Sequence, residues 1–222
     1  MLAKLPMFRQ VAPAHLHKLA RRAELRRAAK DTLLYARGDL AAGCYALVVG
    51  LVSLSLRAAD GAQKVLRLVG AGETFAESAL FDRQPHPVNA LVLADSQLVF
   101  LPAQAIYDLL DHDRAFARAM LEDLSQRIHM LVADIEAYSL SSGMQRIAAF
   151  LYSLADPSAP APAQVRLPAN KTVIASRLGV TKETFSRQLH ELTLLGLVQV
   201  SRRDIALLDP RRLAELARGG KY

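Results

Sequence analysis

Residues 171–190 read KTVIASRLGVTKETFSRQLH, and this stretch decides how the last third of the chain folds. Ile174 and Leu178 are four residues apart, so they share one face of a first short helix. Gly179 follows that helix at the point where the chain must turn, and Thr181 can cap a second helix through its hydroxyl. The pattern predicts two short helices joined by a tight turn.

The second helix has its own apolar face, and two strand-like segments come after it. Phe185, Leu189 and Leu192 recur at helical spacing and form the predicted buried face. Leu197–Val200 and Ile205–Leu208 then flank a polar tip, an arrangement typical of a β wing. We interpret the whole as a winged helix–turn–helix; an ordinary αα-hairpin is the alternative.

The net charge of the chain gathers in the same region. The 222 residues carry 28 Lys+Arg and 21 Asp+Glu, a net charge of +7. Residues 141–222 hold 12 of these cations and 6 of the anions, whereas residues 1–140 hold 16 and 15. A positive field over the last third of the chain favours a polyanionic partner. A basic surface that serves only solubility is the alternative.

Candidate base-reading side chains lie on the outward face of the second helix. Arg187 can contact the O6 and N7 atoms of guanine, Glu183 can accept from cytosine N4, and Ser186 can hydrogen-bond or lie against thymine. An ion pair between Glu183 and Arg187 is the structural alternative. The predicted contacts to double-stranded DNA, including those to phosphates, are Thr181, Lys182, Glu183, Ser186, Arg187, His190, Arg202 and Arg203.

Short strand-like segments separated by glycine fill residues 32–101. Asp60-Gly61 predicts a type I′ hairpin turn. Several short strands at this spacing indicate a β-sandwich or barrel, which we assign to a domain over residues 1–112. The predicted strands are Thr32–Tyr35, Tyr45–Val49, Val52–Arg57, Lys64–Val69, Val88–Leu93 and Gln97–Leu101.

A long helix follows over residues 113–140. Pro102 starts a short helix over Ala103–Leu110, and the polar Asp111–Asp113 junction then caps the long one. Its apolar stripe drifts toward a heptad repeat, which favours packing on a second copy of the chain over packing on the barrel alone. The predicted dimer interface is Phe116, Met120, Leu124, Ile128, Leu131, Ile135 and Tyr138.

The remaining residues, 141–222, form the third predicted part. Ser141–Gly143 has the composition of a hinge, and Met144–Leu154 is a helix. We interpret Ala155–Gln164 as a surface loop within this domain. The fold class is therefore α+β: an N-terminal, jelly-roll-like β-barrel sensor domain, a dimerisation helix, and a C-terminal winged helix–turn–helix.

Composition excludes several classes of protein. At 52% hydrophobic and 22% charged residues, the chain is of globular type. It has no apolar run of 18 residues and no charged-then-apolar signal order, so we expect a cytoplasmic protein without a membrane partner. No nucleophile–base pair, P-loop or metal-ligand spacing indicates an enzyme or a metal site. The single cysteine, Cys44, excludes a cysteine-ligated iron–sulfur cluster.

With these motifs in place, the sequence resembles the CRP/FNR family of bacterial transcription regulators over nearly its whole length. The resemblance rests on the glycine-punctuated barrel, on Gly72-Glu73…Glu77…Leu80-Phe81, on the long helix and on Arg146. Glu183–Arg187 matches the E-x-x-S-R pattern of the FNR side, which implies an operator related to TTGAT-n4-ATCAA. The resemblance also implies a transcription activator with RNA polymerase as a partner.

Within the family, Thr74–Glu77 together with Glu183–Arg187 looks most like the dissimilatory nitrate respiration regulators. That branch implies nitric oxide as the signal and haem as a candidate cofactor. The conceivable haem ligands are His15, His17, His86, His112, His129 and His190, for each of which a solvated or hydrogen-bonded histidine is the alternative. An apolar pocket suits haem, another apolar effector or no effector.

The sequence departs from the cyclic-AMP-responsive members at two places. Val88-Asn89 stands where those members have the Arg-Ser pair that binds the cyclic phosphate, and Leu131-Val132 stands where their long helix offers hydroxyls. A buried phosphate without a cation is costly, so we expect no response to cyclic AMP. The predicted effector pocket is Glu77, Ser78, Val88, Asn89, His129, Leu131 and Val132.

Two functions from different classes remain open. The first is a DNA-binding regulator in which an effector repacks the helix pair and rotates the DNA-binding domains about Ser141–Gly143. The second is an effector-binding module that responds to a cyclic nucleotide or another small molecule without specific DNA recognition. The second would need the missing phosphate-binding arginine and would leave the Glu183–Arg187 helix without a use.

Overall fold

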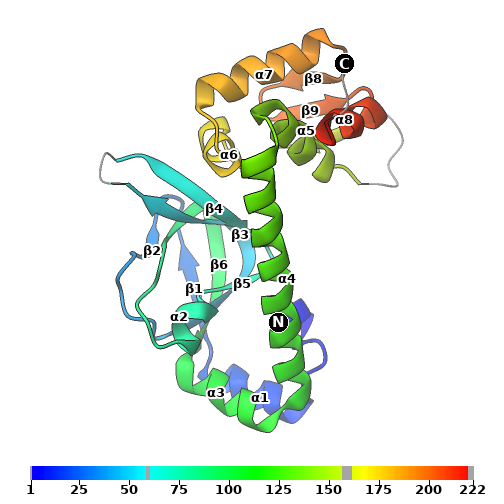
Figure 1. Cartoon of the computed structure of the whole chain (residues 1–222). Coiled ribbons are helices and arrows are strands. Elements are labelled where there is room, and N and C mark those ends of the chain that lie inside the picture. The colour runs from blue at the N-terminus through cyan, green and yellow to red at the C-terminus, as the bar shows by residue number, and fades with distance from the viewer. Residues whose placement is uncertain (1, 59–60, 157–161, 220–222) are drawn as a thin grey trace. The chain divides into compact units, whose positions relative to one another are not determined.

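The computed structural model describes residues 2–58, 61–156 and 162–219. The chain divides into two compact units, one ending at His129 and the other beginning at Met130, so the boundary falls inside helix α4 (Arg114–Leu140). None of the helices in these ranges is both long and apolar enough to cross a bilayer. The α+β fold class is confirmed: a β-sheet domain precedes the long helix and a helix–turn–helix domain follows it (Figure 1).

The N-terminal unit is built on six antiparallel strands. Two 3₁₀ turns (Leu2–Lys4 and Pro6–Phe8) and helix α1 (Pro13–Arg22) precede the sheet, and α2 (Glu77–Phe81) interrupts it. The main strand order is β1-β6-β3-β4, while β2 pairs with β6 and β5 pairs with β3. The strands are β1 (Glu24–Ala28), β2 (Leu33–Tyr35), β3 (Gly43–Arg57), β4 (Gln63–Val69), β5 (Thr74–Phe75) and β6 (Asn89–Pro102).

Two pairs of predicted strands are each a single long strand. Gly50 was expected to separate two strands, but β3 runs through it, and β6 likewise joins the two segments predicted on either side of residue 95. Gly50 has φ +112°, and a Cβ there would lie 2.0 Å from the Ser96 hydroxyl oxygen. The register between β3 and β6 shifts on both sides of this point. Gly50 therefore marks a β-bulge against β6 within one continuous strand.

Strand β1 is absent from the strands that the sequence pattern predicts. This strand reads ELRRA and pairs with β6 from Glu24↔Phe100 to Ala28↔Ser96. Its one large apolar side chain, Leu25, is exposed, so no buried alternation is visible in the sequence. A charged strand at the end of a sheet is a common protection against pairing with another chain. The β3–β4 hairpin is present, although the Asp60 of its predicted turn lies outside the described residues.

The core of this unit contains two clusters with stacked aromatic rings and one buried cysteine. The Phe8 and Phe116 rings stack at 5.6 Å between centroids, which joins the N-terminal turn to the first turn of α4. Tyr45 stacks on Phe75 at 5.2 Å in a second cluster inside the sheet. Cys44, on β3, is 1% exposed, and burial raises the pKa of its thiol well above the ordinary value. Cys44 is thus a packed apolar residue, as expected for an unpaired buried cysteine.

Asp113 fixes the start of α4. It follows α3 (Ala103–His112), and its Oδ1 accepts a hydrogen bond from the Phe116 amide at 3.0 Å, the geometry of an N-cap. Its Oδ2 accepts from the Ala12 amide at 3.0 Å and lies 2.9 Å from His15 Nδ1. The predicted cap is confirmed, and the same carboxylate ties α1 to α4.

The C-terminal unit combines helices with a three-stranded sheet. After α4 come α5 (Gly143–Ser153), β7 (Ala163–Arg166), α6 (Lys171–Leu178), α7 (Lys182–Leu194), β8 (Val198–Ser201), β9 (Asp204–Leu207) and α8 (Pro210–Ala217). The strand order is β7-β9-β8, all antiparallel. The predicted surface loop Ala155–Gln164 is wrong at its end, because Ala163 and Gln164 pair with Leu207 and Ala206. The middle of that loop, residues 157–161, lies outside the described residues.

The surroundings of Asp113 predict that the stability of the N-terminal unit depends on pH. Burial alone would raise the pKa of this carboxyl, but hydrogen bonds from His15, Phe116 and Ala12 outweigh burial and lower the pKa to about 2. A carboxyl whose pKa is lower in the folded state stabilises the fold above its unfolded pKa, near 4, and loses that contribution as the pH falls toward 2. We expect Asp113→Asn to lower the free energy of unfolding by about 2 kcal/mol at pH 7.

Urea unfolding followed by circular dichroism between pH 7 and pH 2.5 measures this effect. The difference between wild type and Asp113→Asn should shrink once the pH falls below about 4. Asp111→Asn, at an exposed neighbour, is the control and should behave as wild type. A difference that stays constant down to pH 2.5 would refute the assignment to the Asp113 charge.

Candidate nucleic-acid interface

Helices α6 and α7 form a two-helix unit with a tight turn. Asn170 caps α6 by accepting from the Val173 amide at 3.0 Å, and Thr181 caps α7 by accepting from the Thr184 amide at 3.1 Å. Gly179 adopts φ +68° between them, a left-handed conformation that costs glycine little. The buried residues are Ile174, Ala175, Leu178, Phe185, Leu189 and Leu192, which confirms the predicted apolar faces.

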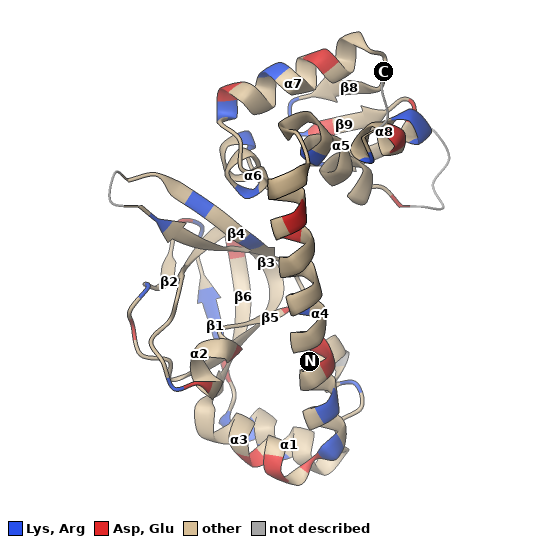
Figure 2. Ribbon diagram, in the orientation of Figure 1, with Lys and Arg blue, Asp and Glu red and all other residues tan. Residues whose placement is uncertain are grey.

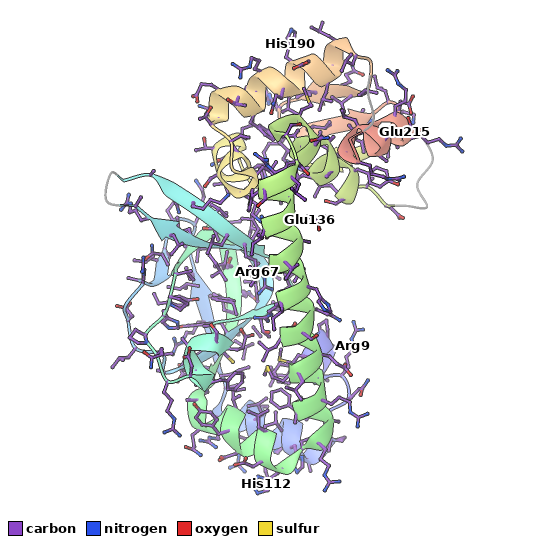
Figure 3. The ribbon with its side chains drawn as sticks, in the orientation of Figure 1. Arg9, Arg67, His112, Glu136, His190 and Glu215 are labelled. Atoms are coloured by element: carbon purple, nitrogen blue, oxygen red, sulfur yellow. The ribbon has the colours of Figure 1, made fainter. Side chains whose placement is uncertain are left out.

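The opposite face of α7 presents polar side chains to solvent. Glu183, Arg187 and His190 are exposed, and Ser186 is half-buried beside them. His190 lies on the outer side of α7 (Figure 3). Figure 2 shows cations and anions distributed along this helix. An acidic and a basic group at the exposed start of a capped helix match the requirements for reading base edges in a major groove.

The alternative for Glu183 and Arg187 was an ion pair along the helix surface. In the described part of the chain, no ion pair or hydrogen bond joins these two side chains. Their charged ends are therefore directed to solvent in this conformation. Thr181 and Lys182 are also exposed at the start of α7, where backbone amides favour an anion such as phosphate.

The wing separates two arginines that the sequence analysis treated alike. Arg202 is exposed at the β8–β9 turn with φ +55°. The Arg203 guanidinium instead donates to the Leu167 carbonyl at 2.7 Å and 3.1 Å and to the Pro168 carbonyl at 2.6 Å. Arg203 thus secures the connection between β7 and α6, which leaves Arg202 as the wing-tip cation of this pair.

In the N-terminal unit, Glu77 is held by an arginine that the sequence analysis did not single out. Glu77 is 1% exposed, and its carboxylate oxygens accept from Arg127 on α4 at 2.7 Å and 3.1 Å. Arg127 also donates to Thr74 Oγ1 at 2.9 Å and pairs with Asp123 at 2.6 Å. Two carboxylates therefore share one guanidinium, and burial raises the pKa of Asp123 despite that partner. Removal of a partner from such a network leaves an uncompensated charge.

A second arginine lies beside this group. Arg67 on β4, labelled in Figure 3, donates to Glu73 at 2.5 Å and to the Thr74 carbonyl at 3.4 Å. Thr74 thus accepts hydrogen bonds from both arginines. Since each guanidinium already faces a carboxylate, neither is a free cation for a phosphate in this conformation.

In the described part of the N-terminal unit, no hydrogen bond or ion pair joins Glu77 to the other predicted effector-pocket residues of that unit. Ser78 is exposed, Val88 and Asn89 are half-buried, and Asn89 Oδ1 accepts from the Arg37 amide at 2.9 Å. His129, Leu131 and Val132 are exposed along α4. Within residues 2–58, 61–156 and 162–219, no three His, Cys, Asp or Glu side chains gather as a metal site would require.

His86 is the histidine with the most unusual surroundings. It is 4% exposed, and its ring stacks on Tyr35 with 3.7 Å between centroids. Its Nδ1 is buried and has no hydrogen-bond partner in the described structure. Burial lowers the pKa of this imidazole, against a weaker opposing effect of Asp39. The ring is therefore a neutral imidazole with one unused nitrogen at neutral pH.

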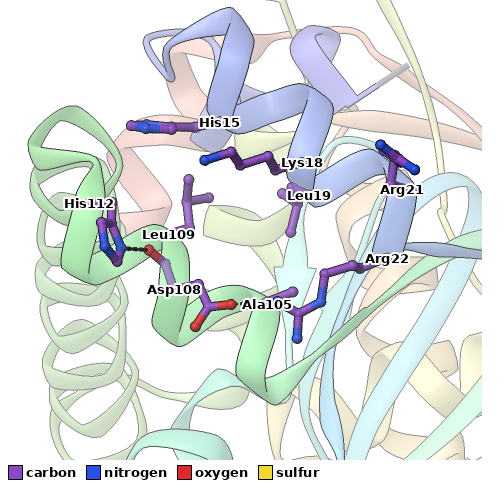
Figure 4. Close-up of a pocket in the computed structure, with 9 residues that line it drawn as sticks. All are labelled: His15, Lys18, Leu19, Arg21, Arg22, Ala105, Asp108, Leu109 and His112. Carbon is purple, nitrogen blue, oxygen red and sulfur yellow. Dashed lines mark hydrogen bonds and ion pairs between the residues drawn. The ribbon is translucent and has the colours of Figure 1, made fainter.

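A cavity of about 420 Å³ lies elsewhere in the unit, between α1 and α3. Leu19, Ala105 and Leu109 form its apolar part, and Lys18 and Arg21 come from α1 (Figure 4). Arg22 and Asp108, which form an ion pair at 2.5 Å, also line it. The cavity contains none of the predicted effector-pocket residues, so it gives that prediction no support.

The predicted dimer stripe divides into two parts, and this corrects the interface. Phe116 and Met120 are 0% and 2% exposed because they fill the core of the N-terminal unit, and Leu124 packs against the same core. Ile128, Leu131 and Ile135 are 60%, 55% and 65% exposed. Tyr138 is half-buried because its hydroxyl bonds to Arg177. An apolar stripe does not reveal which surface covers it. The core of the same chain and a second copy of the helix both require the same spacing of apolar residues.

The two wing arginines should respond differently to substitution. Arg202→Ala is expected to weaken binding to duplex DNA of any sequence and to reduce the salt slope by about 1, because a solvent-exposed cation contributes one phosphate contact. Arg203→Ala should lower the free energy of unfolding by about 1 kcal/mol, because two carbonyls lose a charged donor. Fluorescence anisotropy across a salt series and urea unfolding measure the two effects. Equal loss of DNA affinity with unchanged stability in both variants would contradict the division.

Comparison with known proteins agrees with the geometry of both units. Residues 25–113 match the family model of the cyclic nucleotide-binding domain, and residues 145–216 match that of the Crp-like helix-turn-helix domain. The two matches together cover most of the chain.

Three relatives are similar over most of their own length. The chain is 24% identical to a cyclic AMP receptor protein of Thermus thermophilus, over 96% of this chain and 97% of that one. It is 28% identical to the nitrogen fixation regulation protein FixK of Rhizobium meliloti, over 82% of each. The structure of FixK2 from Bradyrhizobium japonicum superposes with a TM-score of 0.78 at 24% identity, over 87% of this chain and 96% of that one.

The two family matches have the order seen along this chain, a β-sheet domain followed by a helix–turn–helix whose α7 exposes Glu183 and Arg187. CRP-like regulators bind DNA and act as dimers. The chain belongs to the CRP/FNR family of DNA-binding transcriptional regulators.

Proposed function

We propose that this regulator binds as a homodimer to a palindrome related to TTGAT-n4-ATCAA and that a signal other than cyclic AMP controls it. The observation that carries the proposal is the exposed pair Glu183 and Arg187 on a capped α7. In the E-x-x-S-R pattern, these two residues and Ser186 are one helical turn or less apart on one face. The resemblance of that pattern to the FNR side of the family supports this operator.

The chemistry of the three side chains supports reading a mixed half-site. A planar guanidinium can donate two parallel hydrogen bonds to guanine O6 and N7, which no other base offers in the major groove. A carboxylate accepts from cytosine N4, and Ser186 is small enough to allow close approach of α7 to the bases. Lys182 and Arg202 supply phosphate contacts that position the helix without specifying sequence.

The exposed side of α4 supports a homodimer. Ile128, Leu131 and Ile135 expose more than half of their surface, and their spacings of three and four residues follow a heptad seam. Leu121 and Val132 expose 69% and 58% beside them. A second copy of the helix would cover these side chains, and the resulting twofold symmetry would match a palindromic operator.

The sensor unit lacks a free cation at the positions expected for a cyclic phosphate. Val88 carries no charge, and Asn89 already accepts a hydrogen bond from the Arg37 amide. Arg127 is engaged by Glu77 and Asp123. A cyclic nucleotide would bring a buried phosphate charge without compensation, which supports the proposal that cyclic AMP is not the effector.

Haem is our candidate cofactor, and nitric oxide our candidate signal, on the strength of the nitrate-respiration-type motifs and of one structural observation. The buried imidazole of His86 has an unused Nδ1 and a lowered pKa, so it is in the neutral form that ligates iron. Bound haem would supply an iron centre that binds diatomic gases. His86 is the candidate iron ligand, and the Tyr35 ring stacks on its imidazole. Because His86 is 4% exposed and does not line the cavity between α1 and α3, haem could reach it only after a rearrangement of the residues around it.

Control of DNA binding then follows from a shift in population. An effector stabilises whichever arrangement of the dimer binds it more tightly, and the arrangement sets the separation of the two recognition helices. Half-sites one DNA turn apart accept only one separation. We further propose activation through RNA polymerase as the outcome, in keeping with the FNR-like recognition pattern.

Substitution of Arg187 tests base reading. We expect Arg187→Ala to lower the affinity for TTGAT-n4-ATCAA by about 1–3 kcal/mol and to relax the choice of base at one position of each half-site. Lys182→Ala is the control: it removes the same charge from the same helix, and it should weaken cognate and non-cognate sites alike. Gel shifts on the palindrome and on its single-base variants measure both effects.

A uniform loss on all sequences for Arg187→Ala would contradict base reading and assign Arg187 to a phosphate. If the wild-type chain shows no preference for the palindrome over random duplex, the alternative function, an effector-binding module without specific DNA recognition, is favoured.

Ligand binding distinguishes the candidate signals. Thermal unfolding should not change when micromolar cyclic AMP is added, because the predicted phosphate position offers no cation. Reconstitution with haem should give a Soret band that shifts with nitric oxide and is lost in His86→Ala but kept in His129→Ala, since His129 is exposed. A rise in Tm with cyclic AMP would contradict the first expectation. A wild-type sample without a Soret band would contradict the second.

A further inference from the structure

The last turns of helix α4 contact helix α6. Asp134 and Tyr138 are one turn apart in its last turns, and both contact Arg177 on α6. Arg177 Nη2 donates to the two oxygens of Asp134 at 2.9 Å and 2.8 Å. Its Nη1 donates to Tyr138 Oη at 2.9 Å, and Tyr138 Oη in turn donates to the Arg177 backbone carbonyl.

A second arginine joins the ends of the same two helices. Arg146 on α5 donates from Nε to the Leu178 carbonyl at 2.8 Å and from Nη1 to the Ser141 carbonyl at 2.5 Å. Its guanidinium lies 5.6 Å from the centre of the Tyr138 ring. Carbonyls at a helix C-terminus have no partner within the helix. A cation that donates a hydrogen bond to a carbonyl at each of the two helix ends therefore holds these ends at a fixed separation.

We infer that Asp134, Tyr138 and Arg177 form a clamp that positions the recognition helix α7 relative to the dimer helix α4 and so sets the half-site spacing that the dimer accepts. Arg177 is one residue before the end of α6, and the three-residue turn over residues 179–181 then leads into α7. The orientation of α7 is therefore coupled to α4 through a rigid turn. The compact C-terminal unit begins at Met130, which includes all three clamp residues.

The clamp also bears on the hinge that the sequence predicted at Ser141–Gly143. Ser142 is the N-cap of α5 and forms a capping box with Gln145, and the Ser141 carbonyl is held by Arg146. With Arg177 bridging from α6 to α4, this junction is restrained on both sides. Rotation about Ser141–Gly143 would have to break the clamp first.

The clamp is not needed for the domain to fold, and this separates positioning from stability. Helices α6 and α7 bury their own apolar face through Ile174, Phe185 and Leu189, each at most 2% exposed. The Asp134 and Arg177 side chains are still 28% and 24% exposed, and partly exposed ion pairs contribute little to the stability of a fold. A pair of this kind is worth more as an orientation constraint than as a source of stability.

The inference rests on the proposed palindromic operator, and its test compares half-site spacings. Duplexes carry TTGAT and ATCAA separated by three, four, five or six base pairs, and one duplex carries a single half-site. The full-length chain is compared with Asp134→Asn, Arg177→Gln and Tyr138→Phe. Arg166→Gln is the matched control, since it removes the same charge from an exposed pair with Asp204 in the same unit.

We expect the wild-type chain to bind the four-base-pair spacing most tightly and the clamp variants to lose about three- to tenfold of that discrimination. Affinity for the single half-site should be unchanged, because α7 keeps its own packing. The exchanged pair Asp134→Lys with Arg177→Glu should recover part of the discrimination. Arg166→Gln should match the wild type.

Unchanged spacing discrimination in the clamp variants would overturn the inference. So would a parallel fall in half-site affinity and in the free energy of unfolding, because the residues would then be structural only. Failure of the wild-type chain to prefer the palindrome would instead refute the proposed operator.

Amide hydrogen exchange tests the clamp without DNA. The amides of Gly143–Gln145 should exchange faster in Asp134→Asn than in wild type, while those within α7 should not change. Equal exchange at Gly143–Gln145 would overturn the clamp, whatever the operator is.

Discussion

The apolar surface of α4 exceeds what the described part of one chain covers. Phe116 and Met120 are enclosed by the N-terminal core, whereas Ile128, Leu131 and Ile135 expose more than half of their area. Exposed side chains of this size on one contiguous helix face are typical of an interface. The helix therefore has two tasks along its length: its first turns complete a domain, and its later turns present a surface that a second copy of the chain would cover. The position of the DNA-binding elements depends on the same later turns.

The local features of the DNA-binding domain could be predicted from the sequence with little loss. Gly179, Thr181 and the spacing of Phe185, Leu189 and Leu192 each act within one or two helical turns, so their meaning does not depend on distant residues. Asp113 as the cap of the long helix is predictable for the same reason. These local signals agree with one another, which is why the fold class was predicted correctly.

The contacts between distant segments could not be predicted in this way. Glu77 and Arg127 are 50 residues apart, and Asp134 and Arg177 are 43 apart, so no periodicity links them. Arg203 looks like Arg202 in the sequence, and only the fold directs one guanidinium to the Leu167 carbonyl. Asp134 and Tyr138, four residues apart on one helix face, are the signal that could have indicated a polar contact near the end of α4.

Two of the predictions assumed one meaning for a residue type, and the structure gives these residues another. The glycine pattern predicts that Gly50 separates two strands, yet the structure needs it for the close approach of β3 to Ser96. Phe116 and Met120 were assigned to a dimer interface because a helix stripe does not reveal which partner covers it. In both instances the sequence indicates that a glycine or an apolar side chain is needed at the position. It does not indicate which distant residues pack against that position.

The burial of Cys44 has a practical consequence. The Cys44 side chain on β3 is buried, and burial raises the pKa of its thiol, so the thiol resists ionisation. A thiolate-directed reagent can react with Cys44 only when the N-terminal sheet opens. The rate of modification therefore reports the rate at which that domain opens. Because Cys44 is the single cysteine and is buried, such reagents do not modify the folded chain. A cysteine introduced on the recognition face would therefore be the one site labelled, and a probe there could follow the DNA-binding domain alone.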